Sequence, residues 1–236
     1  MTTYVIILIA VIILGIPTII VVNKFPKIRL AFQIVYFVLI VVFGYLLFVN
    51  INKPIAFDRE LDKRYDATVE RLKDIRTIQI VYKDKYGKYT GGLDTIINFV
   101  KHDSLEISKT IQVKEWNQDE VTKEEAFKTG ILVKSSSYVP VFDSLWGKSG
   151  YSIEQIKYVP YIDNVEFTMG AGEVETASKV KVNVFECYVL YSDLLNGMDE
   201  QLIVNYIDEK TKYGGFAGIR VGSLTEANNN AGNWEQ

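Results

Sequence analysis

Two long uncharged runs near the start of the chain constrain its fold more than any other feature. Residues 4–22 and 30–51 contain no Asp, Glu, Lys or Arg. At about 1.5 Å per residue, helices of these lengths extend roughly 28 and 33 Å, which matches the hydrocarbon thickness of a bilayer. The short segment between them suits only a tight turn. The sequence therefore predicts a transmembrane hairpin over residues 1–52 and a soluble domain over residues 53–236.

The cations around these runs bear on the orientation of the hairpin. Lys24, Lys27 and Arg29 all lie in the loop between the two runs, and the positive-inside rule places such a loop in the cytoplasm. Lys53 and Arg59, just after the second run, favour the opposite orientation, but acidic residues alternate with the cations there. We expect a two-pass protein of the bacterial inner membrane whose soluble domain lies in the periplasm.

A cleaved signal peptide is the alternative interpretation of the first run. Signal peptides carry a basic n-region and a small-x-small cleavage site. The first run lacks the basic region, and no such cleavage site precedes the second run. Two membrane spans are therefore the preferred prediction, and because neither span contains an ionisable residue, they predict an anchor and no ion or proton relay.

Charge and composition exclude several classes of function. The chain after residue 51 holds all 29 acidic residues and 23 of the 26 cations, a net charge of −6, which argues against nucleic acid as a partner. One His and one Cys leave no set of ligands for a zinc or iron site, so we predict neither a metal nor a cofactor. His102 is expected on the surface and Cys187 in an apolar strand. No catalytic residue is predicted, and the chain is not expected to be an enzyme.

A long amphipathic helix is predicted over residues 58–86, with Pro54 separating it from the second span. Its apolar stripe recurs every three to four residues and comprises Leu61, Tyr65, Thr68, Leu72, Ile75, Gln79 and Tyr82. Such a stripe packs either on the protein's own sheet or on a partner. We expect the distal half to pack on the sheet. Leu61 and Tyr65, nearer the membrane, are candidates for partner binding.

The end of this helix resembles a known family. Residues 76–89 (RTIQIVYKDKYGKY) are similar to the segment of type IV pilins and pseudopilins in which a helix rising from the membrane ends in a Gly-Lys/Arg-Tyr turn before a sheet. The resemblance implies a helix followed by a sheet. Three departures weigh against filament formation: a second membrane span, the absence of a prepilin-peptidase cleavage signature, and Thr90 where the family usually has Pro.

A second resemblance concerns the end of the chain. The residues from 158–161 (YVPY) through 228–235 (NNNAGNWE) resemble uncharacterised inner-membrane proteins of Bacteroidota-type bacteria. This resemblance implies a protein of the cell envelope and indicates no activity.

The remaining pattern predicts an α+β fold with a mainly antiparallel sheet. Strands are expected at residues 107–114, 131–142, 164–169, 179–190 and 216–222, and helices at 93–100, 120–128 and 198–213. Residues 170–172 (Gly-Ala-Gly) are expected to form a turn. In the strand at 179–190, Val180, Val182 and Val184 share one face.

A short repeat with a spacing of 20 residues supplies two further candidates. Residues 138–145 (YVPVFDSL) match residues 158–165 (YVPYIDNV), and each unit is expected to form an edge strand, a proline and an Asp turn. Two similar edge strands are one explanation, and a pair of equivalent surfaces for an extended peptide is the other. Tyr138 and Tyr158 are therefore partner-binding candidates, since tyrosine is favoured at interfaces.

Three functions follow from these features. The first is a non-enzymatic subunit of an envelope assembly, of a secretion or outer-membrane biogenesis type, whose partners are the lipid bilayer and other envelope membrane proteins. The second is a membrane-anchored enzyme that acts on peptidoglycan or glycan with two carboxylates facing across a cleft. The third is a pilin-like assembly unit.

Overall fold

The computed structural model describes residues 29–114, 122–147 and 152–235. The chain divides into two compact units, Met1–Asp58 and Arg59–Gln236. The first predicted span, residues 4–22, and the loop that follows it lie outside the described residues. The structure therefore shows one long apolar helix and does not show a two-helix hairpin.

Helix α2 (Arg29–Tyr86) is continuous over 58 residues. The expected separation at Pro54 is wrong, because Pro54 lies inside the helix. A proline removes one intrahelical hydrogen bond and crowds one preceding carbonyl. The uninterrupted helical hydrogen bonds on both sides of Pro54 outweigh that single loss.

The part of α2 in the first unit is apolar and exposed. The most apolar window of the helix, near the N-terminus, has a mean hydropathy of 2.7, and none of that window is buried. Its large exposed side chains include Phe37, Ile40, Tyr45 and Phe48. Exposed apolar surface of this extent marks a site of membrane or protein contact. By length and composition, this helix is able to cross a membrane.

The part of α2 in the second unit buries most of the distal half of its stripe, as predicted, and it also buries Leu61 of the proximal half. Leu72, Ile75 and Ile78 are fully buried, and so are the polar residues Thr68 and Gln79. Thr68 donates a hydrogen bond to the Arg64 carbonyl oxygen (2.7 Å). Because each buried polar side chain has a hydrogen-bond partner, the stripe carries two polar members without a large desolvation cost.

Long polar side chains tie this part of α2 to distant segments. Arg64 donates to the carbonyl oxygens of Leu194 (3.1 Å) and Asn196 (3.0 Å). The Gln79 side chain donates to the Thr90 carbonyl oxygen (2.5 Å) and accepts from the Thr90 N–H (3.2 Å). These bonds satisfy loop carbonyls that sheet hydrogen bonds do not reach.

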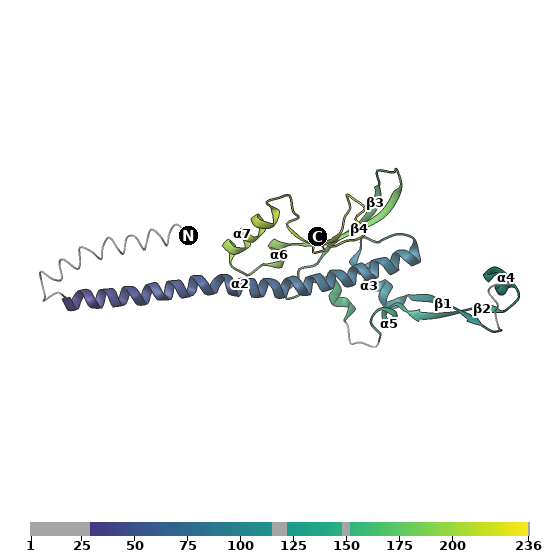
Figure 1. The fold of residues 1–236 in the computed structure, drawn as a ribbon, viewed down its shortest axis with the longest axis horizontal. Coiled ribbons are helices and arrows are strands. Elements are labelled where there is room, and N and C mark those ends of the chain that lie inside the picture. Colours follow the sequence, from purple (N-terminus) through teal and green to yellow (C-terminus); the bar gives the residue numbers. More distant parts are fainter. Residues whose placement is uncertain (1–28, 115–121, 148–151, 236) are drawn as a thin grey trace. The chain divides into compact units, whose positions relative to one another are not determined.

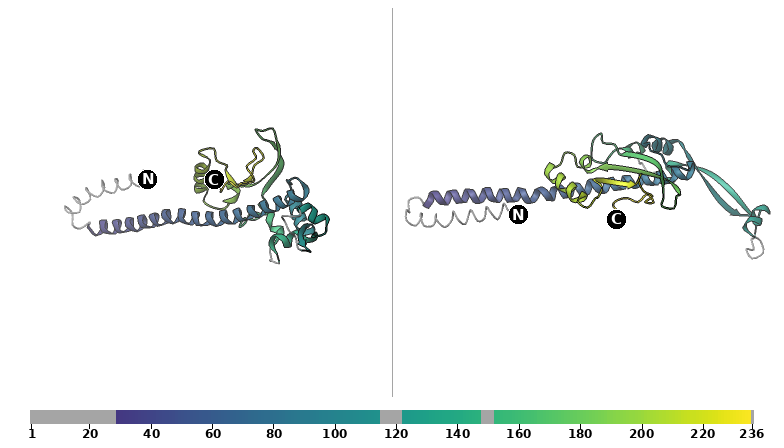
Figure 2. Two further views of the ribbon diagram at one scale, coloured as in Figure 1. Left: turned by 45° about the vertical axis from the view of Figure 1, so that its right-hand side comes forward. Right: turned by 90° about the horizontal axis from the view of Figure 1, so that it is seen from above.

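The described chain has an α+β fold with two small antiparallel sheets (Figure 1). One is the two-stranded ribbon β1–β2, and the other has the order β3-β4-β5; Figure 2 shows both from further directions. The elements after α2 are α3 (Leu93–His102), β1 (Ser104–Gln112), α4 (Lys123–Lys128), β2 (Leu132–Pro140), α5 (Val141–Trp146), the 3₁₀ helix η2 (Ile153–Lys157), β3 (Thr168–Glu175), β4 (Lys181–Leu190), α6 (Tyr191–Leu194), α7 (Glu200–Thr211) and β5 (Gly218–Gly222).

One face of the three-stranded sheet belongs to the core. On β4 the buried side chains of this face are Phe185, Cys187 and Val189, and the Met169 position pairs with Cys187. Gln79 of α2 lies 3.2 Å from the Met169 sulfur, so α2 packs toward this face. The face that carries Val182 and Val184 is therefore the other one, because side chains alternate along a strand, and Val180 lies before β4 begins at Lys181.

The predicted elements around β3 and the repeat need correction. The strand expected at 164–169 lies at Thr168–Glu175, so Gly170 and Gly172 are strand residues and not a turn. The Leu224 side chain covers Gly170, where an added Cβ would lie 3.0 Å from it. The two repeat units also differ: β2 runs into helix α5 after Pro140, whereas residues 158–165 are irregular, with Tyr161 at φ 64°.

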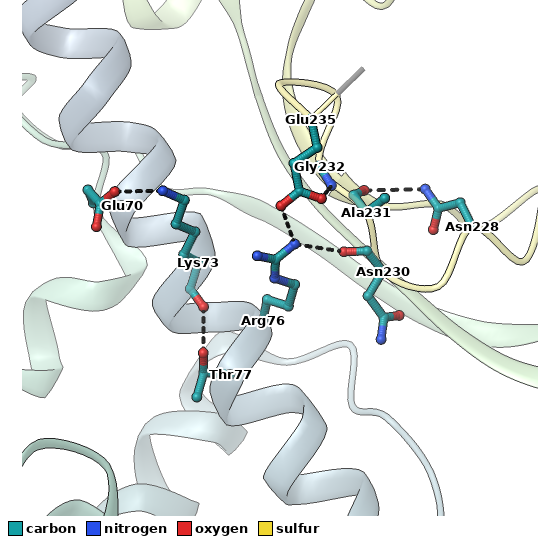
Figure 3. A network of polar contacts seen from close by, with 9 residues as sticks. All are labelled: Glu70, Lys73, Arg76, Thr77, Asn228, Asn230, Ala231, Gly232 and Glu235. Atoms are coloured by element: carbon teal, nitrogen blue, oxygen red, sulfur yellow. Dashed lines mark hydrogen bonds and ion pairs between the residues drawn. The ribbon is translucent and has the colours of Figure 1, made fainter.

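The C-terminal segment is fastened to α2 by Arg76 (Figure 3). Its guanidinium forms an ion pair with Glu235 (2.7 Å) and donates to the Asn230 carbonyl oxygen (3.4 Å). Glu235 also accepts from the Gly232 N–H (3.1 Å), and the Arg76 hydrogen bond lowers the pKa of its carboxyl group. A bridge between Val221 and Gly232 extends the sheet beyond β5.

Candidate partner-binding surfaces

The β1–β2 ribbon is rooted at Asp103, the residue that caps α3. The Tyr86 hydroxyl donates to one oxygen of the Asp103 carboxylate (2.5 Å), and the Lys85 ammonium lies 2.9 Å from the other. Lys85 also donates to the Ser104 carbonyl oxygen (3.1 Å), at the first residue of β1. The hydrogen bond from Tyr86, followed by that from Lys85, lowers the pKa of Asp103. The end of α2 therefore holds the start of the ribbon in place.

The register of the ribbon gathers aliphatic side chains on one face. The strands pair antiparallel from Ser104 with Pro140 to Gln112 with Leu132. Because side chains alternate, every second position lies on the same face. We call the set comprising Leu105, Ile107, Ile111, Val133 and Val139 the apolar face. Lys109, opposite Ser135, is the one charged residue among these positions of the paired strands.

The apolar face is open along most of its length. Ile111 and Val133, which pair with each other, are 49% and 45% exposed, and Ile107 is also exposed. A two-stranded ribbon is at best marginally stable without a packed face. Its aliphatic side chains are thus positioned to contact another molecule.

The opposite face of the ribbon has a cover at its outer end. Helix α4 begins with a capping box, in which Thr122 and Glu125 bond to each other's backbone N–H. Ala126 of this helix and Leu132 of β2 are both buried, and the Lys134 ammonium lies 5.6 Å from the centre of the Phe127 ring. Helix α4 therefore covers only the outer end of this face, and Tyr138, further along the same face, is 72% exposed.

The four sequence-predicted candidates occupy separate places. Tyr138 is 72% exposed and pairs with Glu106, on the face opposite the apolar face. Tyr158 lines a cavity of about 370 Å³ with Arg71, and Tyr65 lines a different cavity of about 260 Å³. Leu61 is only 8% exposed, so the structure places it in the core of its unit. These residues do not form one surface.

The residues considered for chemistry are also separate. His102 is exposed at the end of α3, whereas Cys187 is fully buried, and burial raises the pKa of its thiol. A thiol in this state is a poor nucleophile. Among the described residues, no group of three or more His, Cys, Asp and Glu side chains is arranged to hold a metal ion.

Comparisons with family models, with curated proteins and with solved structures found no match to this chain. The arrangement of its own side chains is therefore the basis for inferring a function. The apolar face is the surface that the sequence reasoning missed. In the sequence this face is visible as the alternation of Leu105, Ile107 and Ile111, but a buried strand shows the same alternation.

Proposed function

We propose that the chain is a membrane-anchored, non-enzymatic binding subunit that contacts a partner protein through the apolar face of its β1–β2 ribbon. The observation that carries this proposal is the exposure of the paired residues Ile111 and Val133 on a ribbon whose root is fixed at Asp103. Exposed aliphatic surface on a positioned element supports protein binding.

The membrane part of the proposal is a two-pass anchor in the bacterial inner membrane. It is supported by the two uncharged runs and by the exposed apolar part of α2. Lys24, Lys27 and Arg29 support a periplasmic location for the second unit. A reporter fused after Gln236 should then be active when it requires the periplasm. Activity only of a reporter that requires the cytoplasm would refute this orientation.

The proposed partner is another envelope membrane protein, in an assembly of the secretion or outer-membrane biogenesis type. The test is co-purification of the tagged full chain from its native membrane in mild detergent. Ile111→Asp places a charge on the apolar face, and Thr110→Asp places one at the next position, on the opposite face. We expect the same partner to be lost with Ile111→Asp and retained with Thr110→Asp. Equal retention by both variants, or no partner with the native chain, would contradict the proposal.

One observation favours a second candidate function, a glycan-active enzyme. A cavity of about 550 Å³ between the end of α2 and the base of the ribbon is lined by both Asp84 and Glu106. Two carboxylates on one cavity are the minimum for glycoside hydrolysis. Hydrolysis of purified peptidoglycan by the full chain, abolished in both Asp84→Asn and Glu106→Gln, would establish this function in place of the binding subunit.

A further inference from the structure

Another cavity lies away from the ribbon, where six parts of the chain converge. It has a volume of about 260 Å³ and is lined by Tyr65 of α2, Tyr191 of α6, Lys210 of α7, the loop residues Gly214, Gly215 and Phe216, and Arg220 and Asn233 from β5 and the C-terminal segment. We call it the tyrosine–lysine cavity. Its volume is below the range typical of drug-sized ligands, so it suits a small molecule or the end of a chain.

Two glycines shape the wall of this cavity. Gly214 follows α7 with φ +80°, a conformation that residues with a side chain rarely adopt. A Cβ on Gly215 would collide with the Lys210 carbonyl oxygen. The loop can therefore turn closely against the end of α7 only because both positions lack a side chain.

The two cations of the cavity differ in how their charges are balanced. The Arg220 guanidinium lies over the Phe216 ring (4.9 Å) and forms an ion pair with Glu186 (3.3 Å). The Lys210 ammonium lies 5.3 Å from the centre of the Tyr206 ring and, within the part of the chain that the structure describes, forms no ion pair with a carboxylate. Lys210 is exposed, and among the described residues that line the cavity it is the cation without an ion pair.

Two phenol groups also line the cavity, and one of them supplies a neutral hydrogen-bond donor. The Tyr65 hydroxyl makes no hydrogen bond to another described residue, and burial, followed by the charge of Asp66, raises its pKa. Burial is also the main cause of the raised pKa of Tyr191, whose hydroxyl shares a hydrogen bond with that of Tyr206. Tyr65 is therefore the protonated phenol of the two whose hydroxyl can donate to an anion.

We propose that the tyrosine–lysine cavity binds a small carboxylate, held by the Lys210 ammonium and the Tyr65 hydroxyl. One cation without an ion pair matches a monoanion, and an ammonium and a hydroxyl that line the same cavity can donate charge-assisted hydrogen bonds to its two oxygens. The carboxylate could belong to a free acid or to the end of a peptide. This inference is independent of the ribbon, so the failure of one proposal leaves the other standing.

The test measures binding of four probes to the detergent-solubilised full chain by ligand-observed NMR. Lactate represents a free acid, N-acetylalanine represents a peptide end, N-acetylalaninamide is its neutral isostere, and inorganic phosphate is the competing anion. We expect N-acetylalanine or lactate to bind about tenfold more tightly than the amide. The acid that binds more tightly shows whether the carboxylate comes from a free acid or from the end of a peptide. Equal binding of acid and amide, tighter binding of phosphate, or no binding would overturn the proposal.

Three variants locate the site. Lys210→Met should weaken binding of the preferred acid about tenfold, and Tyr65→Phe, which removes one hydroxyl, about threefold. Lys212→Met is the matched control, because Lys212 follows α7 and does not line the cavity. It should change binding less than twofold. Loss of binding in Lys212→Met to the same extent as in Lys210→Met would show only nonspecific attraction to positive charge and would refute the site.

Discussion

The two antiparallel β structures of the second unit both alternate apolar with other side chains, but one buries its apolar face and the other exposes it. In the three-stranded sheet, Phe185 is fully buried and its ring lies 4.9 Å from that of Tyr89. In the ribbon, Ile111 stands at an equivalent alternating position and is half-exposed. The sheet receives the side chains of α2, whereas α2 reaches the ribbon only at its root. The same strand pattern therefore stabilises the unit in one place and presents a surface in the other.

The largest effect is expected from a charge in the stripe of α2. Leu72→Asp replaces a fully buried side chain with an unpaired carboxylate and should abolish cooperative thermal unfolding of the full chain. The sequence makes Leu61 a candidate for partner binding, but its side chain is buried in the folded chain. Leu61→Asp should therefore lower the Tm clearly, although by less than Leu72→Asp. If Leu61→Asp has the same Tm as the wild type, Leu61 does not contribute to the core and remains a candidate for partner binding.

Truncation within the sheet should rank second. Phe185→Ala leaves a cavity beneath Tyr89 and should lower the free energy of unfolding by about 3–5 kcal/mol. Urea unfolding followed by circular dichroism measures this change. A loss below about 1 kcal/mol would mean that the sheet, like the ribbon, contributes little to stability, and the contrast between them would disappear.

The root of the ribbon should respond to pH. The pKa of Asp103 is lowered in the folded state, so its contribution to stability is present above the unfolded pKa of about 4 and is lost as the pH falls through the lowered value. Asp103→Asn should lower the free energy of unfolding by about 1 kcal/mol at neutral pH.

The acid range provides the control for Asp103. The difference between wild type and Asp103→Asn should shrink as the pH falls below about 4, because the unfolded chain then takes up a proton at Asp103, and should vanish once the folded carboxyl group is protonated as well. A difference that stays constant between pH 3 and pH 7 would show that ionisation of Asp103 does not hold the ribbon.

The smallest effect on stability should come from the apolar face itself. Ile111→Ala removes a half-exposed side chain and should change the free energy of unfolding by less than about 0.5 kcal/mol. The measurement is the same urea titration as for Phe185→Ala. A loss approaching that of Phe185→Ala would mean that the chain itself buries this face.

Local sequence patterns predicted where the helices and strands lie better than they predicted what each element packs against. The stripe from Leu61 to Gln79 repeats with helical period, and the helix ends at Tyr86 as expected. The predictions at Pro54 and residues 170–172 are wrong because each is a strong local signal of a break or turn. Packing overrides such signals: a long helix tolerates one proline, and the Leu224 side chain fills the space beside the glycine of β3.

The candidate sites were less predictable for a different reason. Tyr65, Lys210 and Arg220 line one cavity but lie up to 155 positions apart, and nothing in the local sequence pairs them. The apolar face has a visible alternation, yet alternation alone does not reveal whether a strand is covered. Exposure depends on which elements pack nearby, and that information exists only in the folded chain.

Photo-crosslinking in the native membrane tests the central contrast most directly. A photoreactive residue in place of Ile111 would probe the apolar face, and one in place of Thr110 would probe the opposite face at the adjacent position. The proposed function predicts a discrete adduct of the chain with a partner protein from position 111 and a much weaker one from position 110. Equal adducts from both positions, or none from position 111, would contradict the assignment of the ribbon as the partner-binding element.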